Sequence, residues 1–334
     1  MKASVVIPVY NKVPWLKECL ESVFAQTFTD FEVVAVDDAS TDGSLEVLRS
    51  FRDPRLRIIE LPHNVGPGGA AQRGMDAAQG EYVIRVDADD IMYPDRFAVQ
   101  VAVLDGDPAI GATSGHIRLM SEPDTLHRVE LSNEAAKARM LFGVPLNQPA
   151  TAYRSAVLRQ HNVRFDDAWP RYGEDWMHQL ELARHTKFLN LDRPLIHYRK
   201  GSMNIAHGRD RVADQRTLSR YVFDRLGWPL TDAQRDLHLA TVKCFPRPFT
   251  QADVVAYRDW LARLSQLNRE FGTFDQAALD TQLAQHWNAL FYHLPAFGLG
   301  VALQHMRCDG RWSWGKWRYL LSAVLTGRGT GTRR

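Results

Sequence analysis

The stretch 64-NVGPGGAAQRGMDAAQGEYVIRVDADD-90 decides the fold of this chain. Its Ala-rich part, residues 70–78, predicts a helix that follows a Gly-Pro-Gly-Gly turn, and the apolar run 81–86 predicts a buried strand. Three carboxylates, those of Asp87, Asp89 and Asp90, follow this strand within four positions. Because like charges at this spacing repel one another, a cation is expected among them. The stretch therefore predicts a helix, a strand and a cation site in succession.

Strand and helix signals alternate from the N-terminus to this stretch. Such an order requires right-handed crossovers and predicts an α/β fold with a mostly parallel sheet and helices on both faces. Ligands of these sheets bind beyond the carboxyl ends of the strands. Tyr10, the pair Asp37 and Asp38, and the acidic residues 87–90 are therefore expected at one edge. The predicted strands are 3–10, 31–38, 55–61 and 81–86, and the predicted helices are 14–26, 42–51 and 70–78.

The composition predicts a folded chain. It has 334 residues, of which 45% are apolar and 24% charged, without a repeat or a low-complexity tract. Three cysteines in no C-x-x-C pattern indicate neither a disulfide framework nor a zinc site, which favours a cytoplasmic protein. No signal peptide is expected, because residues 1–11 lack an apolar stretch before a cleavage site.

The positive charge lies in the tail. The formal net charge is +2, but seven Lys and Arg residues against one Asp lie from Gly300 onward. The preceding part is therefore net acidic, and it has no basic stripe with interleaved aromatic residues. This distribution argues against a nucleic-acid partner.

The C-terminal third is predicted to be mainly helical, beginning near residue 211. Its apolar run 287–303 is interrupted by a His and a Pro and is a poor candidate for a membrane-spanning helix. A Trp-rich, basic segment with an interfacial pattern follows. Residues 287–326 are therefore either a helical cap with Trp residues in its core or a peripheral contact with an anionic membrane, at its inner face.

Four ordered motifs resemble the signatures of the inverting family 2 glycosyltransferases of GT-A fold. The motifs are SVVIPVYNK (4–12), VVAVDDASTDGS (33–44), the stretch quoted above, and YGEDW (172–176) with LIHYR (195–199). The resemblance covers about residues 1–205. It implies a nucleotide-sugar-binding half at 1–110 and an acceptor-binding half at 111–210. The helical region with a basic Trp-rich tail, predicted from its residue pattern, follows at 211–334.

The acidic stretch fits the chemistry of a nucleotide-diphosphate sugar. Mn²⁺ and Mg²⁺ prefer oxygen ligands, so a carboxylate at a strand end can hold the metal while the diphosphate completes its shell. By the family pattern, Asp89 would ligate the metal and Asp87 would meet the ribose. Asp90 would support them, or it would cap a helix near Pro94 together with Asp95.

The resemblance also implies the contacts with the nucleobase. Asp38 would accept from the base, with Asp37 as its competitor and the backbone near Pro8 and Tyr10 beside it. The alternative is that one of the two aspartates caps the helix that begins near Thr41.

The chain departs from the family at one donor-binding position. Many relatives read Ala-Arg-Asn where this chain has Ala71 at the Arg position and Arg73 two residues later. Either Arg73 substitutes or the donor is held differently. The preceding Gly66–Gly69 turn could cradle a phosphate, although it is not a dinucleotide fingerprint. Arg199 lies where relatives place a residue that reaches the diphosphate and offsets leaving-group charge.

The motif around residues 172–176 implies the catalytic groups. Inverting transfer needs a base that takes the proton of the acceptor hydroxyl. Asp175 matches the family's base, and Glu174 would orient a loop or an acceptor hydroxyl. The alternative is that both carboxylates merely favour the N-terminus of a helix dipole.

The expected function is metal-dependent, inverting transfer of a sugar from a nucleotide-diphosphate donor, with a UDP-sugar as the first expectation. The acceptor would be a carbohydrate or a lipid-linked glycan in surface polysaccharide or glycolipid synthesis. A sugar nucleotidyltransferase is less favoured, because the first strand is not followed by a Gly-rich loop. A phosphatase of the Asp-x-Asp type is also less favoured, because its nucleophilic Asp would follow the first strand, whereas the acidic stretch of this chain follows the fourth. A non-catalytic nucleotide- or sugar-binding relative stays open because of the shifted Arg73.

Overall fold

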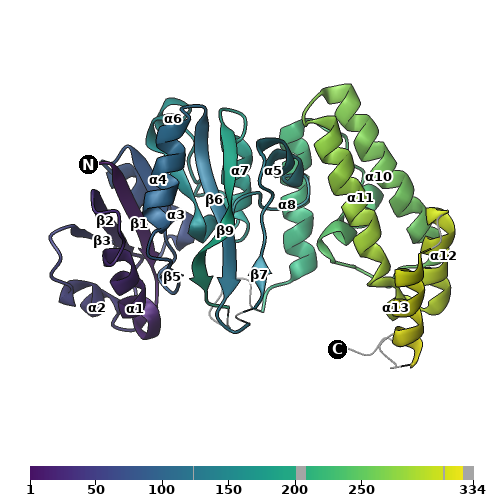
Figure 1. Cartoon of the computed structure of the whole chain (residues 1–334), viewed down its shortest axis with the longest axis horizontal. Helices are drawn as coiled ribbons and strands as arrows, with labels where there is room; N and C mark the ends of the chain where they lie inside the picture. The colour runs from purple at the N-terminus through teal and green to yellow at the C-terminus, as the bar shows by residue number, and fades with distance from the viewer. Residues whose placement is uncertain (123, 201–207, 311–312, 326–334) are drawn as a thin grey trace. The chain divides into compact units, whose positions relative to one another are not determined.

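The computed structural model describes residues 1–122, 124–200, 208–310 and 313–325 (Figure 1). The chain divides into two compact units. One comprises residues 1–137 and 144–207, and the other comprises residues 138–143 and 208–334. The predicted half 1–110 lies in the first unit, and so does the predicted half 111–210 apart from residues 138–143 and 208–210. Both halves contribute strands to one sheet.

A nine-stranded sheet forms the centre of the first unit. Its order is β3-β2-β1-β4-β8-β6-β9-β5, and β7 pairs with β6. The strands β3, β2, β1 and β4 are parallel, and β1 and β2 are in register from Ala3↔Phe31 to Val9↔Asp37. The strands are β1 (Ala3–Val9), β2 (Phe31–Asp37), β3 (Leu56–Glu60), β4 (Tyr82–Arg85), β5 (Ile91–Met92), β6 (Ile110–Leu119), β7 (Leu126–His127), β8 (Ala152–Arg154) and β9 (Lys187–Tyr198).

The sheet becomes mixed beyond β4. The short strand β8 is antiparallel to both β4 and β6, and β5 is antiparallel to β9, whereas β6 and β9 are parallel. Antiparallel pairing does not require a crossover helix, so strands of two or three residues can join here. The predicted parallel character therefore describes the N-terminal half of the sheet, which contains the edge where ligands are expected.

Helices cover both faces of the sheet. Successive residues of a strand point to opposite faces, and β2 shows this: Val33 and Ala35 join one apolar core, while Val34 and Val36 join another. The first core includes buried residues of α1 and α4, and the second includes Ala70 of α3. The helices up to residue 182 are α1 (Val13–Phe24), α2 (Ser44–Ser50), α3 (Gly66–Ala77), α4 (Arg96–Gly106), α5 (Asn133–Arg139), α6 (Ser155–Gln160) and α7 (Glu174–Leu182).

Helix α3 begins earlier than its composition predicts. The glycines that were expected to form a turn before the helix lie in its first turn, which starts at Gly66. Gly74 explains how closely α3 approaches the sheet, because a Cβ at this position would lie 2.4 Å from Val6 Cγ1 and 3.2 Å from Val36 Cγ2. Tertiary contacts, described below, stabilise the glycine-rich start.

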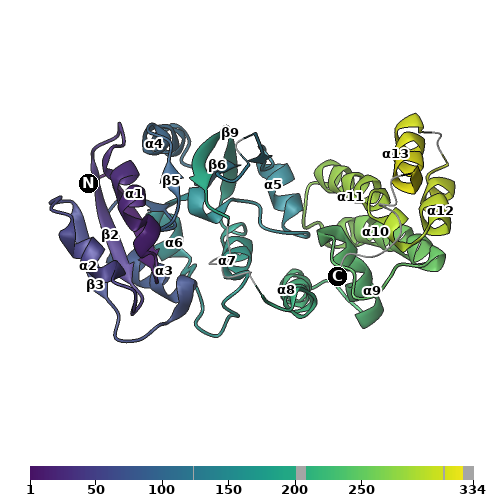
Figure 2. The same cartoon turned by 90° about the horizontal axis from the view of Figure 1, so that it is seen from below.

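The second unit is helical. Its helix α10 starts with a capping box in which the Thr250 side chain accepts from Asp253 N and Asp253 accepts from Thr250 N. Helices α10 and α11 lie side by side (Figure 2). None of the described helices is both long and apolar enough to cross a bilayer. The helices are α8 (Arg211–Leu226), α9 (Asp232–His238), α10 (Gln251–Phe271), α11 (Gln276–Phe291), α12 (Leu299–Asp309) and α13 (Trp314–Leu325).

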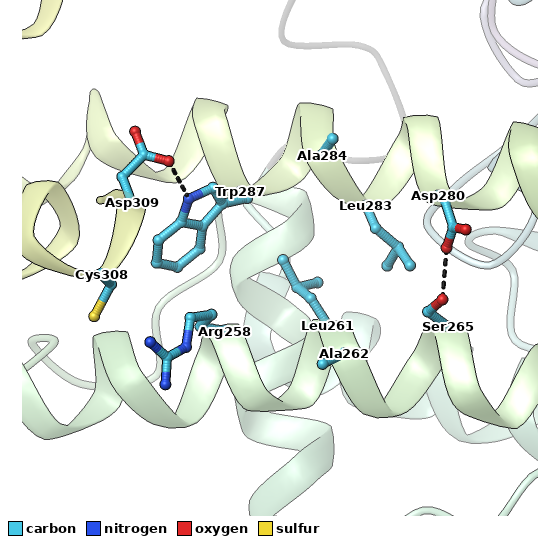
Figure 3. A pocket seen from close by; sticks show the side chains of 10 residues that line it. All are labelled: Arg258, Leu261, Ala262, Ser265, Asp280, Leu283, Ala284, Trp287, Cys308 and Asp309. Atoms are coloured by element: carbon cyan, nitrogen blue, oxygen red, sulfur yellow. Dashed lines mark hydrogen bonds between the residues drawn. The ribbon is translucent and has the colours of Figure 1, made fainter. Parts of the chain in front are cut away.

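A groove of about 310 Å³ lies among α10, α11 and α12 (Figure 3). Two hydrogen bonds lie along it: Trp287 Nε1 donates to Asp309 Oδ1 over 3.1 Å, and Ser265 Oγ donates to Asp280 Oδ1 over 2.6 Å. Leu261, Leu283 and two alanines form its apolar part. The groove contains none of the residues that the sequence motifs single out.

Candidate active site

The carboxyl ends of β1, β2 and β4 meet at one edge of the sheet, as parallel pairing requires. Asp38 N donates to Val9 O over 2.8 Å, which fixes the end of β2 beside the end of β1. Val86 N donates to Val6 O over 3.2 Å, which fixes the end of β4 on the other side of β1. At the end of β1, Pro8 is partly buried and Tyr10 is 46% exposed.

Asp38 holds the start of α3. Its carboxylate accepts from Val65 N over 2.7 Å, from Gly66 N over 2.9 Å and from Asn64 Nδ2 over 2.9 Å. Helix N-termini leave N–H groups without intrahelical partners, and the first of these groups in α3 are therefore satisfied by Asp38. Burial raises the pKa of Asp38. A nucleobase at Asp38 would donate to the carboxylate lone pairs that these three hydrogen bonds do not occupy.

Asp37 is buried like Asp38 but makes fewer hydrogen bonds. Its Oδ2 accepts from Ser40 N over 3.2 Å, while Oδ1 is buried without a hydrogen-bond partner in the described part of the chain. The first turn of α2 is served by Asp42, whose Oδ1 accepts from Ser44 N over 3.0 Å. Neither aspartate of the pair therefore caps this helix.

Each carboxylate after β4 has its own donor. Asp87 Oδ1 accepts from Arg85 Nη2 over 3.1 Å, and Asp90 Oδ1 accepts from Arg199 N over 2.9 Å. Asp89 Oδ2 pairs with Lys12 Nζ at 2.5 Å. Burial raises the pKa of Asp87 and of Asp90. The side chain of Asp90 is fully buried and supports the loop from inside the protein. Asp95, at the start of α4, makes no side-chain capping hydrogen bond to that helix.

Two cations flank the ring of Trp15 at this edge. Lys12 Nζ lies 5.5 Å and Arg199 Cζ 5.6 Å from the ring centroid. Arg199 also donates from Nε to Asp89 O over 3.1 Å and from Nη2 to Glu18 over 3.0 Å. The sequence motifs indicated Arg199 but not Lys12. The signal for Lys12 was its place directly after the first strand, at the edge where the carboxylates were expected.

The carboxylates fit a metal only together with a diphosphate. Among the described residues, no three His, Cys, Asp or Glu side chains are grouped closely enough to hold a metal ion. Asp89 offers one carboxylate, and Lys12 occupies one of its oxygens. A hard cation such as Mn²⁺ or Mg²⁺ takes six or more oxygen ligands. Most of them would therefore have to come from the diphosphate and from water.

Helix α7 begins with the two predicted catalytic carboxylates. Glu174 accepts from the backbone N–H of Gly68, and a Cβ at Gly68 would lie 2.7 Å from Glu174 Oε2. Glu174 therefore binds the first turn of α3. Burial raises the pKa of Glu174 to about 7. The neighbouring Asp175 accepts from Trp176 N over 2.9 Å, and burial raises its pKa as well.

Arg85 acts on the carboxylates at the end of β4 and on those at the start of α7. Its guanidinium is buried in β4 and donates to Val6 O over 3.3 Å and to Asp87 over 3.1 Å. Its positive charge lowers the pKa of Asp87, Glu174 and Asp175 against the effect of burial. Sequence reasoning missed Arg85, because a single Arg in an apolar strand gives no signal of its own.

Two further arginines differ in their surroundings. Arg73 pairs with Asp167 at 3.5 Å, and both side chains are well exposed. Arg171, which the motifs did not indicate, hydrogen-bonds Asn64 beside Asp38. The structure therefore brings Asp37, Asp38, Asp87, Asp89 and Arg199 to one edge, and it leaves Arg73 with a surface partner.

Comparison with known proteins indicates a family for the N-terminal part of the chain. Residues 4–162 match the family model described as Glycosyl transferase family 2. The succinoglycan biosynthesis protein ExoO of Rhizobium meliloti is 29% identical over 242 residues, which are 66% of this chain and 69% of that protein. The chain spans between 15% and 64% of the lengths of seven further curated relatives.

Two solved structures share the fold. One is Staphylococcus aureus TarS 1–349 in complex with UDP-GlcNAc, with a TM-score of 0.55 and 20% identity over 98% of this chain and 92% of that one. The other is the mannosyltransferase PcManGT from Pyrobaculum calidifontis in complex with GDP-Man and Mn²⁺, with a TM-score of 0.51 and 20% identity over 97% and 86%. These likenesses confirm the expected GT-A type of fold.

Proposed function

The chain belongs to glycosyltransferase family 2 through residues 4–162, and we propose that it transfers a sugar from a nucleotide-diphosphate donor to an acceptor hydroxyl with inversion. One observation carries this proposal. Burial raises the pKa of Asp175 at the start of α7, and the negative charge of Asp87 at the end of β4 raises it further. The proposed ribose contact and the proposed base, 88 positions apart in sequence, therefore interact electrostatically.

Asp175 is the proposed base. It takes the proton of the acceptor hydroxyl as that oxygen forms a bond to the anomeric carbon, and the bond from that carbon to the diphosphate breaks on the opposite face. Burial raises the Asp175 pKa, which makes its carboxylate a better proton acceptor than an exposed one. The leaving nucleoside diphosphate carries away the electron pair of the broken bond.

The donor site is proposed to comprise the residues at the sheet edge. Asp38 and Asp37, with the backbone at Pro8 and Tyr10, would hold the base, and Asp87 would hold the ribose. A divalent cation, Mn²⁺ or Mg²⁺, would be held by Asp89 and would neutralise the diphosphate when bound. Lys12 and Arg199 lie beside Asp89 and would offset charge on the leaving group. Arg73 keeps its proposed role in donor binding only if its pair with Asp167 opens.

A UDP-sugar is the first donor to test. The TarS structure that shares the fold holds UDP-GlcNAc, whereas the PcManGT structure holds GDP-Man, so the fold accepts both bases. The proposed acceptor is a carbohydrate or a lipid-linked glycan in surface polysaccharide synthesis, and the name of ExoO, a succinoglycan biosynthesis protein, supports this class.

A cytoplasmic enzyme that touches the inner face of the membrane would suit a lipid-linked acceptor. Within the proposed contact segment 287–326, of which 311, 312 and 326 lie outside the described residues, helix α13 exposes several apolar side chains. Sedimentation with vesicles containing anionic lipid tests this part: binding by the wild type and its loss in Leu321→Asp would support the contact. The exposed apolar residues of α13 are Trp314, Tyr319, Leu321, Val324 and Leu325.

Thermal stabilisation by nucleotides tests the proposed function. UDP, GDP, CDP and dTDP are added to the purified protein with and without Mn²⁺, because a ligand that binds only the folded state raises its stability. We expect one diphosphate to stabilise the wild type in the presence of metal and Asp89→Ala to lose that effect. If no diphosphate stabilises the wild type under either condition, the donor site is wrong and a non-catalytic relative becomes the better interpretation.

A further inference from the structure

Arg171 is tied to the loop that carries the proposed nucleobase site. Its Nη1 donates to Asn64 Oδ1 over 2.7 Å, and its Nη2 donates to Asn64 O over 3.2 Å. The two residues are 107 positions apart, and Arg171 lies just before α7. A guanidinium that holds both the side chain and the backbone of one residue fixes the position of that residue well.

Asn64 passes this constraint on to Asp38. Asn64 Nδ2 donates to Asp38 Oδ2 over 2.9 Å and to Asp38 O over 3.2 Å. The same carboxylate accepts from the next two backbone N–H groups of the loop. Arg171, Asn64 and Asp38 therefore form a continuous chain of hydrogen bonds, and the positive charge of Arg171 lowers the pKa of Asp38 against the effect of burial.

Gly66 provides room for the Arg171 side chain. Its φ of +87° lies in a region that side-chain-bearing residues rarely adopt. A Cβ at this position would lie 3.2 Å from both Cδ and Nε of Arg171. The arginine stem therefore lies directly against the backbone of the loop, and the segment from Asn64 to Gly66 lies between Arg171 on one side and Asp38 on the other.

Positions 71 and 73, which the resemblance to the family singles out, make no such contact with the Asp38 loop. Ala71 stands where relatives carry an arginine, and it is buried with no functional group. Arg73 is directed to Asp167 on the surface. Of the three, Arg171 is the one that contacts the Asp38 loop.

We propose that Arg171 takes the place of the arginine missing at position 71 and selects the nucleobase together with Asp38. This inference rests on the proposed function. Uracil and thymine present an N3–H to a carboxylate and a carbonyl oxygen at position 4 to a guanidinium, whereas cytosine presents an acceptor at N3 and an amino donor at position 4. Two of the five N–H donors of an arginine serve Asn64, which leaves donors for a base carbonyl. Arg171 therefore favours UDP and dTDP over CDP.

Equilibrium binding of UDP and CDP, with Mn²⁺ present, tests the inference on the full chain. We expect Arg171→Ala to weaken UDP binding by about 10-fold and to reduce the preference for UDP over CDP by a similar factor, as the loss of one good base contact would. Arg164→Ala, which removes an exposed arginine that pairs with Asp76, should bind UDP within about 2-fold of the wild type. Arg171→Lys, which keeps the charge, should recover part of the affinity.

The outcomes separate the inference from the proposed function. If the wild type binds UDP and Arg171→Ala binds it equally well, or if Arg171→Ala weakens UDP and CDP by the same factor, the inference is wrong and the function stands. A loss in Arg73→Ala without one in Arg171→Ala also overturns it. If the wild type binds no nucleoside diphosphate, the proposed function is wrong as well. The urea unfolding midpoint of each variant, together with Arg171→Lys, shows that lost binding is not lost folding.

Discussion

The Lys12 ammonium lies 2.5 Å from Asp89 Oδ2, and the two side chains are only 18% and 10% exposed. The carboxylate that is proposed to hold a metal therefore already has a cation beside it. Lys12 at Asp89, Arg85 at Asp87 and the backbone N–H of Arg199 at Asp90 together explain how the free protein tolerates three neighbouring carboxylates. A metal would have to share Asp89 with Lys12 or displace it.

Replacing Lys12 with Met should destabilise the free protein and make it respond more strongly to metal. Removing one partner of a largely buried pair leaves the other charge uncompensated, so the free energy of unfolding should fall by about 1–3 kcal/mol. Mn²⁺ should raise the free energy of unfolding of Lys12→Met by more than it raises that of the wild type. Urea unfolding with and without Mn²⁺ measures both effects.

Lys17→Met is the control for this change. Lys17 is 75% exposed and lies 3.8 Å from Glu21, so its loss should change the free energy of unfolding by less than about 0.5 kcal/mol. Equal stabilisation of the wild type and Lys12→Met by Mn²⁺ would show that Lys12 does not compete with the metal.

Glu174 should make stability fall as the pH rises from about 4.5 to 7. The folded protein keeps a proton on Glu174 up to a pKa of about 7, whereas the unfolded chain loses it near 4.5. The folded state therefore binds more protons in this window, so raising the pH destabilises it, by an upper limit of about 3 kcal/mol above pH 7. Glu174→Gln stays neutral and still accepts from Gly68 N. Its unfolding free energy should decline less between pH 5 and pH 8.

Urea unfolding at pH 5, 6, 7 and 8 measures this difference. Other buried carboxyls, such as Asp38 and Asp175, have pKa values raised in the same direction, so only the gap between the wild type and Glu174→Gln reports on Glu174. Glu21→Gln changes an exposed carboxylate and is the matched control. Parallel curves for the wild type and Glu174→Gln would contradict the buried, protonated state of Glu174.

Replacing Asp175 with Asn should greatly slow turnover without weakening donor binding. The amide can still accept from Trp176 N but cannot take the proton of the acceptor hydroxyl. We expect kcat to fall by about 10²- to 10⁴-fold and the donor Kd to stay within about 2-fold of the wild-type value. Steady-state rates and nucleotide binding measure the two effects separately. A variant with the wild-type kcat would remove Asp175 as the base, and it would favour the helix-dipole explanation of its position.

Replacing Gly74 with Ala should disturb the packing of α3 on the sheet. A Cβ 2.4 Å from Val6 Cγ1 forces the helix or the strand to shift, and overpacking of this kind costs about 1–3 kcal/mol. A Cβ at Gly106, at the end of α4, would meet nothing within 4 Å, so Gly106→Ala should instead stabilise by about 0.4–1 kcal/mol. Urea unfolding measures the change in the free energy of unfolding for both variants, which should have opposite signs. If Gly74→Ala leaves this free energy unchanged, α3 can shift to make room for the Cβ.

The local patterns predicted much of the first unit. The apolar runs at 3–10, 31–38 and 81–86 became β1, β2 and β4, because continuous β-branched segments fit a sheet that is buried on both faces. The strands β5 and β8, with two and three residues, were not anticipated. Segments this short have no periodicity to read, and their pairing depends on neighbours far away in sequence.

The candidate site divides in the same way. The motifs indicated Asp38, Asp89 and Asp175 because their residue types follow directly on a strand or begin a helix. They did not indicate Lys12 or Arg171, whose roles come from partners 77 and 107 positions away.

The sequence by itself determined the order of strands and helices, the edge at which the carboxylates gather and the class of chemistry that they suit, since these follow from local patterns and from the rule that parallel strands end together. Only the tertiary structure decided which cation faces which carboxylate. Asp89 meets Lys12, and the Asp38 loop meets Arg171. The physical reason is that such pairings depend on distances of a few ångströms, and the chain sets them only when its distant segments pack.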